Sequence, residues 1–190
     1  MENRDAIDRN GRTTRYLLLM KADRIQPRIR SLIRQITGNG QTAIVISLNQ
    51  PSKILLKHYR EDGIDCSRVF IVDAVTLYGG GVCEPNPNIR CVTSPANLTE
   101  LGIGIIDILR RAPPGKKCVI LDSVSTLLIH APAGSVTKFL HITSNKLRQK
   151  DIPAVFLCLE KGIDPVIRSG LSVFADRIID LGNENDWAYK

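Results

Sequence analysis

Asp122 is the residue whose position in this 190-residue sequence most clearly suggests chemistry. It directly follows the apolar run at residues 118–121 and precedes Ser123. A buried strand that ends in an aspartate is the Walker B pattern, in which the carboxylate holds Mg²⁺ through water. Asp122 and Ser123 therefore form a Walker B-like pair, and Asp122 is a candidate metal ligand. The alternative is a carboxylate that only caps the turn after its strand.

Asp73 ends a second apolar run, at residues 69–72. The carboxyl ends of parallel strands meet at one edge of a sheet, which is where such folds bind ligands. One interpretation is therefore a divalent cation shared by Asp73 and Asp122. The default interpretation remains two ordinary strand-end carboxylates.

Three basic residues, Lys21, Arg24 and Arg28, follow the first apolar run, at residues 16–20. Their side chains are candidates for contacts with an anion, a nucleotide or a partner. A phosphate loop at this place would read G-x-x-x-x-G-K-[ST], because bare backbone N–H groups must wrap the phosphates. Residues 12–37 contain no glycine, so the backbone lacks the positive φ values and close approach that the loop uses.

Asp23 is also unfavourable for phosphate binding. It is predicted to be the N-cap of the following helix, with Gln26 three residues later as the second half of a capping box. A carboxylate there would occupy the helix end that receives phosphate and would repel the anion. The glycines at residues 79–81 and 115 are interpreted as turns, since neither segment has the order of strand, loop, Gly-Lys-[ST] and helix.

Short apolar runs alternate with amphipathic segments along most of the chain. Continuously apolar runs are typical of strands buried on both faces, and apolar residues at i, i+4 and i+7 are typical of helices packed on a sheet. The predicted strands cover residues 16–20, 42–48, 69–72, 89–92, 118–121, 154–159 and 177–181. The predicted helices cover residues 25–36, 51–62, 98–109, 136–147 and 164–171. This alternation predicts an α/β fold, a three-layer α/β/α sandwich with a mainly parallel sheet.

The predicted organisation is a basic flexible arm at residues 1–14, one α/β domain at residues 15–182 and a polar tail at residues 183–190. The net charge is +7 and the pI is about 9.3. Residues 1–35 contribute +5 of this charge, with nine Lys or Arg against four acidic residues. A basic front of this kind favours nucleic acid, an acidic partner or simply a soluble surface.

The five cysteines and the lack of a predicted targeting segment indicate the cellular compartment of the protein. No signal peptide is predicted at the N-terminus, and no apolar run approaches the ~20 residues of a membrane span. Cys118 and Cys158 lie in apolar runs, where a reduced cysteine packs as a small core residue. Cys83 and Cys91 flank a loop rich in Pro and Asn, and pairing or metal binding is the alternative for them. The sequence favours a reduced, cytoplasmic protein with no membrane segment.

Several short strings of this sequence, in their order, resemble the RecA-like P-loop ATPases of the KaiC branch. They lie at residues 44–51, 118–128, 138–141, 146–148, 154–159 and 174–181. The resemblance covers roughly residues 15–181 and depends on the order of elements and on these strings. It implies a RecA/KaiC-like fold and a nucleotide triphosphatase core that assembles into rings or filaments.

Two parts of the sequence depart from the pattern of that family. Residues 20–27 lack the phosphate loop, that is, the Walker A motif. In the family a pair of glutamates after the second strand activates the attacking water, and Asn49 and Gln50 stand at the matching positions. Side-chain amides keep the hydrogen bonding but cannot accept a proton at neutral pH. The resemblance therefore implies a degenerate member of the superfamily.

The leading hypothesis is a catalytically degenerate RecA/KaiC-like domain that acts as a regulatory or assembly module without ATP hydrolysis. A protein partner or a second copy of the chain would dock on the basic residues, and no cofactor is expected. One alternative is an ATPase that uses Mg²⁺ and an unorthodox phosphate site built from Lys21, Arg24 and Arg28. The other is a nucleic-acid-binding protein whose affinity falls with salt, although aromatic residues make up only 5% of the chain.

Overall fold

The strands pair in an order that differs from their order in the sequence. The computed structural model describes residues 14–160 and 165–181. Within them, one seven-stranded sheet has the order β4-β3-β2-β5-β6-β1-β7, and all neighbouring strands are parallel. The strands are β1 (Arg15–Met20), β2 (Thr42–Ser47), β3 (Val69–Asp73), β4 (Ile89–Cys91), β5 (Lys117–Asp122), β6 (Ala154–Leu159) and β7 (Arg177–Asp180). The predicted α/β class with a parallel sheet is confirmed.

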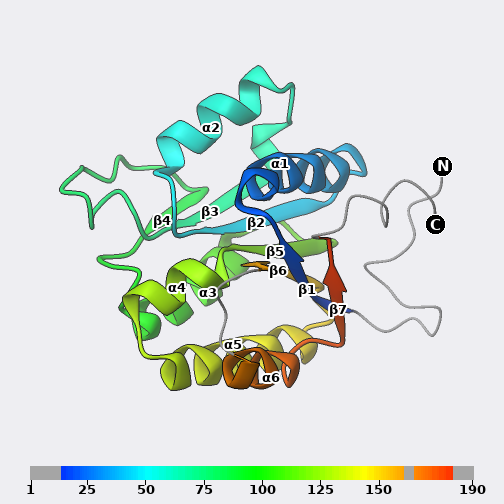
Figure 1. Ribbon diagram of the computed structural model, residues 1–190. Helices are drawn as coiled ribbons and strands as arrows, with labels where there is room; N and C mark the ends of the chain where they lie inside the picture. Colours follow the sequence, from blue (N-terminus) through cyan, green and yellow to red (C-terminus); the bar gives the residue numbers. More distant parts are fainter. Residues whose placement is uncertain (1–13, 161–164, 182–190) are drawn as a thin grey trace.

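Helices cover both faces of the sheet and complete three layers (Figure 1). One face carries α1 (Ala22–Gly38) and α2 (Ser52–Glu61), and a 3₁₀ turn, η1 (Cys66–Arg68), leads into β3. The other face carries α3 (Leu98–Arg111), α4 (Val124–His130), α5 (Ala133–Arg148) and α6 (Pro165–Ser172). Each face therefore has its own apolar core.

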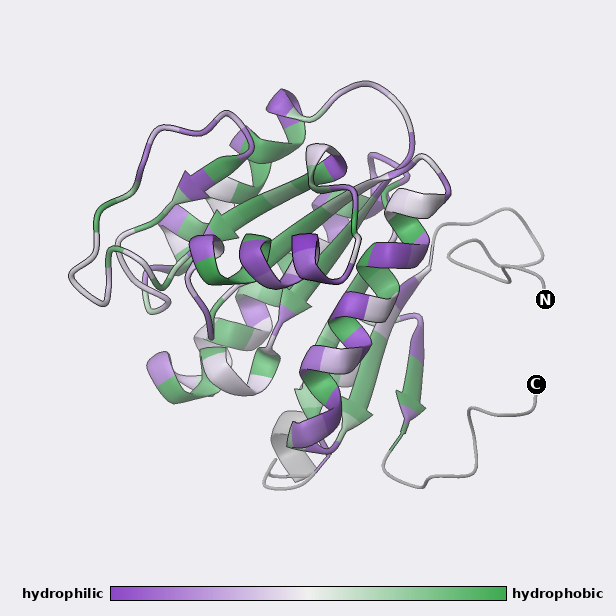
Figure 2. Cartoon of the chain, turned by 90° about the horizontal axis from the view of Figure 1, so that it is seen from above, coloured by the Kyte–Doolittle hydropathy of each residue, from purple (hydrophilic) through white to green (hydrophobic). Residues whose placement is uncertain are grey.

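The apolar strands explain why the sheet is covered on both sides. Every residue of β2 and β3 is buried, as expected for parallel strands between two helical layers. Figure 2 shows the strands as mostly hydrophobic and the outward surfaces of the helices as more hydrophilic. Within residues 14–160 and 165–181, no helix is long and apolar enough to cross a bilayer.

Helix α1 begins immediately after β1, with Lys21 as the single residue between them. The prediction that Asp23 caps this helix is wrong, since Asp23 lies exposed within the first turn and Gln26 bonds elsewhere. The physical reason is packing: Ile25 and Ile29 are buried against the sheet, and such an apolar stripe stabilises a helix more than a cap does.

A disulfide joins Cys83 to Cys91 at the edge strand β4. The expectation that all cysteines are reduced is therefore wrong for this pair, because the loop before β4 returns to the sheet and brings the two Cα atoms to 6.2 Å. Cys118 and Cys158 are free and buried, as predicted.

The glycines at residues 79–81 form a turn in that loop, as predicted. The N–H of Gly81 donates to the carbonyl of Thr76 at 2.8 Å, and Gly80 has a φ of +77°. A Cβ atom at position 81 would lie 3.0 Å from the Thr76 carbonyl oxygen, so both positions favour glycine. The segment continues into the loop before β4 and opens no helix.

Candidate functional site

Strands β2 and β5 are neighbours from which the chain continues in opposite directions across the sheet. β2 leads through α2 to β3, whereas β5 leads through α4 and α5 to β6 on its other side. Helices α2 and α4 lie on opposite faces. Open parallel sheets bind ligands at such a switch point, beyond the carboxyl ends of the strands. Ser47 at the end of β2 is in register with Asp122 of β5, so the candidate site lies here.

The Asp122 carboxylate is the centre of this site and is only 1% exposed. Its Oδ2 accepts a hydrogen bond from Nε2 of Gln26 at 2.7 Å, and its Oδ1 accepts one from Nδ2 of Asn49 at 2.9 Å. Its backbone carbonyl accepts the N–H of Leu48 at 3.0 Å. Burial raises the pKa of Asp122, and the bonds from Gln26 and Asn49 partly oppose that rise. Side chains from α1 and from the end of β2 thus converge on one buried carboxylate.

Asn49 is exposed, whereas the Asp122 carboxylate to which it bonds is buried. Asn49 therefore lies on the solvent side of this carboxylate. While its amide nitrogen bonds to Asp122, its Oδ1 accepts a bond from the Thr126 hydroxyl at 2.7 Å. Ser123 is the N-cap of α4, and its Oγ accepts the Thr126 N–H at 3.4 Å. The peptide bond between Asp122 and Ser123 is cis. Asn49 therefore links the end of β2 to both β5 and α4.

Gln50 is held in place through its backbone carbonyl group. Its carbonyl oxygen accepts a hydrogen bond from the Ser47 hydroxyl at 2.6 Å. Its Oε1 atom is buried and has no hydrogen-bond partner among the described residues. Neither Asn49 nor Gln50 brings a carboxylate to the switch point, so neither side chain can serve there as a general base.

Asp73 belongs to a separate network. Strand β2 lies between β3 and β5, and Ser47 is in register with Asp73 on one side and Asp122 on the other. Asp73 accepts the N–H of Ser52 at 2.7 Å and the Thr76 hydroxyl at 2.6 Å. Burial opposes the ionised form, but the bonds from Thr76 and Ser52 outweigh it and lower the pKa of Asp73. The structure does not bring the two aspartates together, and no cluster of three or more potential metal ligands occurs among the described residues.

The three predicted anion contacts lie at the start of α1. Lys21 and Arg24 are exposed, Arg28 is half-buried, and burial lowers the pKa of Arg28. Arg24 lies 3.9 Å from the Asp23 carboxylate. These groups share the first turns of α1 with Gln26, the residue that reaches Asp122.

Much of the remaining basic charge of the first 35 residues is used inside the fold. Arg15 is 4% exposed and pairs with Asp176 at 2.5 Å. Arg30 and Arg34 of α1 lie 3.1 and 4.0 Å from Asp62, at the end of α2. Residues 1–13 lie outside the described residues, and their three arginines are matched in number by three acidic residues. The basic excess therefore belongs to β1 and α1, and part of it ties α1 to α2.

Two members of the site were missed in the sequence. Gln26 is predicted to belong to a capping box but instead bonds to Asp122, and Thr126 is not among the predicted site residues. The signal for Gln26 lies in its position, one turn into a helix that directly follows β1 and faces the same sheet edge as Asp122. For Thr126, the spacing of three residues from the N-cap Ser123 places it in the first turn of α4.

Comparisons with known proteins agree with this architecture. The uncharacterized protein PH0321 from Pyrococcus horikoshii, solved in complex with an unknown peptide, is 13% identical, with a TM-score of 0.65 over 88% of this chain and 76% of that one. The KaiC-like protein PH0186 from Pyrococcus horikoshii OT3 is 14% identical, with a TM-score of 0.61 over 92% and 74%. These similarities show a fold of the RecA/KaiC type. No curated protein matches the sequence. Residues 18–181 match the model of DUF7504, a family of unknown function, and the chain belongs to that family.

Proposed function

We propose that this member of DUF7504 is a catalytically degenerate RecA/KaiC-like domain that works through protein contacts, as a regulatory or assembly module, without hydrolysing ATP. The observation that carries the proposal is the hydrogen bonding of the buried Asp122 carboxylate. Both of its carboxylate oxygens accept amide N–H groups, from Gln26 and Asn49. A Walker B carboxylate must instead be available to the water shell of Mg²⁺.

The connection between β1 and α1 supports the same conclusion. One residue, Lys21, joins the strand to the helix, which leaves no loop whose N–H groups could surround a triphosphate. The exposed carboxylate of Asp23 lies in the first turn of α1. It opposes an anion at that helix end. Lys21, Arg24 and Arg28 are the side chains that an unorthodox phosphate site would use.

The residues after β2 are the third support. In the resembled family, this position provides the base that activates water. Here the Asn49 amide is engaged at both ends, by Asp122 and by Thr126. An amide in this arrangement positions its neighbours but accepts no proton.

A protein partner is the occupant that we favour for this edge. Exposed apolar side chains lie on the loop after β3 (Leu77, Tyr78, Val82) and at Ile129 of α4. The rings of Tyr78 and His130 are 5.4 Å apart, edge to face, so this loop adjoins the end of α4. Exposed apolar groups of this kind are typical of contact surfaces. PH0321, which shares the fold, was solved with a peptide.

The test combines binding and turnover. Millimolar ATP or GTP, with and without Mg²⁺, is expected to leave the melting temperature unchanged, because a ligand of the native state would raise it. Phosphate release is expected to equal that of an Asp122→Ala variant. Nucleotide-dependent stabilisation, or turnover that Asp122→Ala abolishes, would refute the proposal. Sedimentation of the chain over a range of concentrations then separates self-assembly from docking of a different protein.

A further inference from the structure

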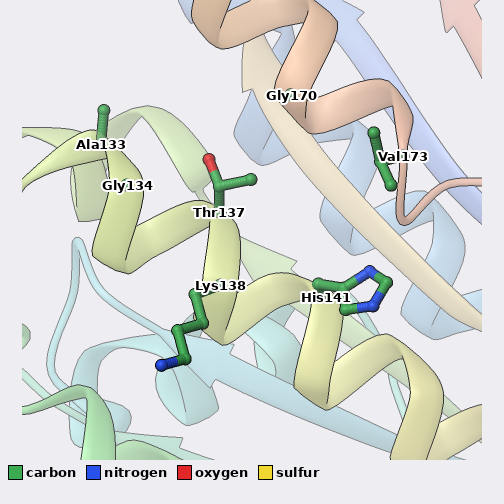
Figure 3. Close-up of a pocket in the computed structure, with 7 residues that line it drawn as sticks. All are labelled: Ala133, Gly134, Thr137, Lys138, His141, Gly170 and Val173. Atoms are coloured by element: carbon green, nitrogen blue, oxygen red, sulfur yellow. The ribbon is translucent and has the colours of Figure 1, made fainter.

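A groove of about 540 Å³ lies between α5 and α6, on the face of the sheet opposite α1 and α2. Small residues shape it: Ala133, Gly134 and Thr137 on α5, and Gly170 on α6. A Cβ atom at position 170 would already lie 3.5 Å from Cγ2 of Thr137. Figure 3 shows Thr137 pointing toward α6, with Val173 on the far side of the groove. The size is typical of a pocket for a small ligand or a large side chain.

Exposed apolar side chains lead from the sheet edge to this groove. Val173, which lines it, is 68% exposed, and Ile178 of the edge strand β7 is 41% exposed. Ile178 is in register with Leu17, whose side chain belongs to the core beneath α5. Residues in register share a face of the sheet, so Ile178 lies on the same face as α5 and α6. Exposed apolar side chains therefore lie on the same face of the sheet at β7 and at the groove.

The rim of the groove is basic. Lys138 and His141 line it from α5, and both are exposed. The ring of His141 is positioned by a 3.0 Å hydrogen bond with the Asn145 side chain. No acidic residue is among the described residues that line the groove. An occupant with an apolar or aromatic anchor and nearby carboxylates would match both the floor and the rim.

The C-terminal residues of this chain have that composition. Residues 182–190 read Gly-Asn-Glu-Asn-Asp-Trp-Ala-Tyr-Lys, and Trp187 is the single tryptophan of the protein. Glu184 and Asp186 precede it. Tryptophan and tyrosine are the residue types that most often anchor a segment in a small apolar pocket.

The length of the segment allows it to reach the groove. The described chain ends at Leu181, just after β7. Trp187 is six positions after Leu181, and six residues span up to about 20 Å when extended. The four residues of β7 rise about 13 Å. A segment that turns back along the Ile178 side of the sheet thus covers the length of β7 with about 7 Å left to extend toward Val173, which lies four residues before β7.

We propose that the groove between α5 and α6 binds residues 182–190 of the same chain, with Trp187 inserted beside Val173 and with Glu184 and Asp186 facing Lys138 and His141. The docked segment covers the apolar surface of α5, α6 and Ile178. This contact involves no nucleotide chemistry, so its test is independent of the proposed function above.

The test uses the fluorescence of Trp187 in the full chain. We expect an emission maximum blue-shifted from that of the protein unfolded in guanidinium, and an acrylamide quenching constant severalfold lower. Val173→Glu places a carboxylate in the groove and is expected to return both quantities to the values of the unfolded chain. Ile103→Glu is the matched control, since Ile103 is 58% exposed on α3 and does not line the groove. It is expected to change neither quantity.

A second pair of variants tests the rim. Lys138→Glu is expected to raise the quenching constant, more at low salt than at high salt, whereas Lys146→Glu, on the same helix and outside the groove, is not. A Trp187 that is quenched as strongly in the native wild type as in the unfolded chain overturns the proposal. So does protection that Val173→Glu leaves intact, because the indole would then pack elsewhere. Protection that appears only as protein concentration rises assigns the segment to a second copy and overturns the intramolecular contact.

Discussion

Replacing Gln26 with alanine is expected to destabilise the protein by removing one of the two side-chain donors to Asp122. A hydrogen bond to a charged group contributes about 1.5–3 kcal/mol. Asp122 is 1% exposed, so solvent does not screen this bond. Two effects reduce the loss: alanine is a better helix former than glutamine by a few tenths of a kcal/mol, and Gln26 is only half-buried, so water can enter the gap. The expected net loss is about 1–2.5 kcal/mol in the free energy of unfolding.

The penalty should depend on pH in a defined direction. Burial raises the pKa of Asp122, and the Gln26 hydrogen bond opposes that rise. Without Gln26 the folded-state pKa rises further, while the unfolded chain keeps a value near 3.9. The folded variant then binds a proton that the unfolded chain has released. The unfolded chain is common to both proteins, so the stability of the variant relative to the wild type falls as the pH rises from the raised folded-state pKa of the wild type to the still higher one of the variant. The penalty is smallest below the folded-state pKa of the wild type, where Asp122 is protonated in both folded proteins.

Urea unfolding of the wild type and of Gln26→Ala at a series of pH values measures both effects. Thermal melting offers a second readout, and the expected loss corresponds to a fall of about 2–10 °C. Gln149→Ala is the control, since Gln149 is exposed at the end of α5, and surface changes stay within about 0.5 kcal/mol. A Gln26→Ala penalty no larger than that control, or one that shrinks as pH rises, would refute the assignment of Gln26 to Asp122.

Four further predictions concern other polar groups of the fold and of the site. Asp176→Ala is expected to cost about 2–3 kcal/mol in urea unfolding, because it leaves the buried guanidinium of Arg15 without its 2.5 Å partner and Asp176 itself is one-third exposed. Burial opposes the ionised form of Asp176, but hydrogen bonds and charges from the arginines lower its pKa, so the wild type should lose this contribution as pH falls below about 3.9. Asn49→Asp places a second carboxylate beside Asp122, so its unfolding midpoint should fall further below the wild type as pH rises from 4 to 8. In a phosphate-release assay, Asn49→Glu combined with Gln50→Glu should show no hydrolysis, since the phosphate loop is still missing. Tyr59→Phe removes a buried hydroxyl that has no hydrogen-bond partner in the described structure, and it should be neutral or stabilising by up to about 1 kcal/mol in the same unfolding assay.

The fold was predictable because burial leaves a direct trace in the sequence. Strands enclosed on both faces must be apolar at every position, as β2 and β3 are, and this separates them from amphipathic helices such as α1. The order of the strands leaves no such trace. Local patterns do not show that β1 inserts between β6 and β7, because that pairing depends on the crossover connections.

The site was predictable at its strand ends and not at its contacts. Asp122, Asn49 and Gln50 follow apolar runs, and parallel topology brings such positions to one edge. The bond from Gln26 depends on how close α1 starts to β1, and a cap signal at Asp23 suggested a later start. Pairing of Cys83 with Cys91 was an open alternative and not the favoured prediction for a similar reason, since sequence spacing does not show how a loop returns to its sheet.

The departures at residues 20–27 and at Asn49 are connected through Asp122. A carboxylate that is buried at the switch point must be compensated, either by a cation or by hydrogen-bond donors. Starting α1 directly after β1 lets Gln26 serve as one donor, and an amide at position 49 serves as the other. A glutamate at position 49 would place a second carboxylate next to Asp122. The low dielectric of this buried site would strengthen the repulsion between the two charges. The short connection and the amide therefore act together. A protein that lost only one of them would leave Asp122 buried with one of its two side-chain hydrogen-bond donors.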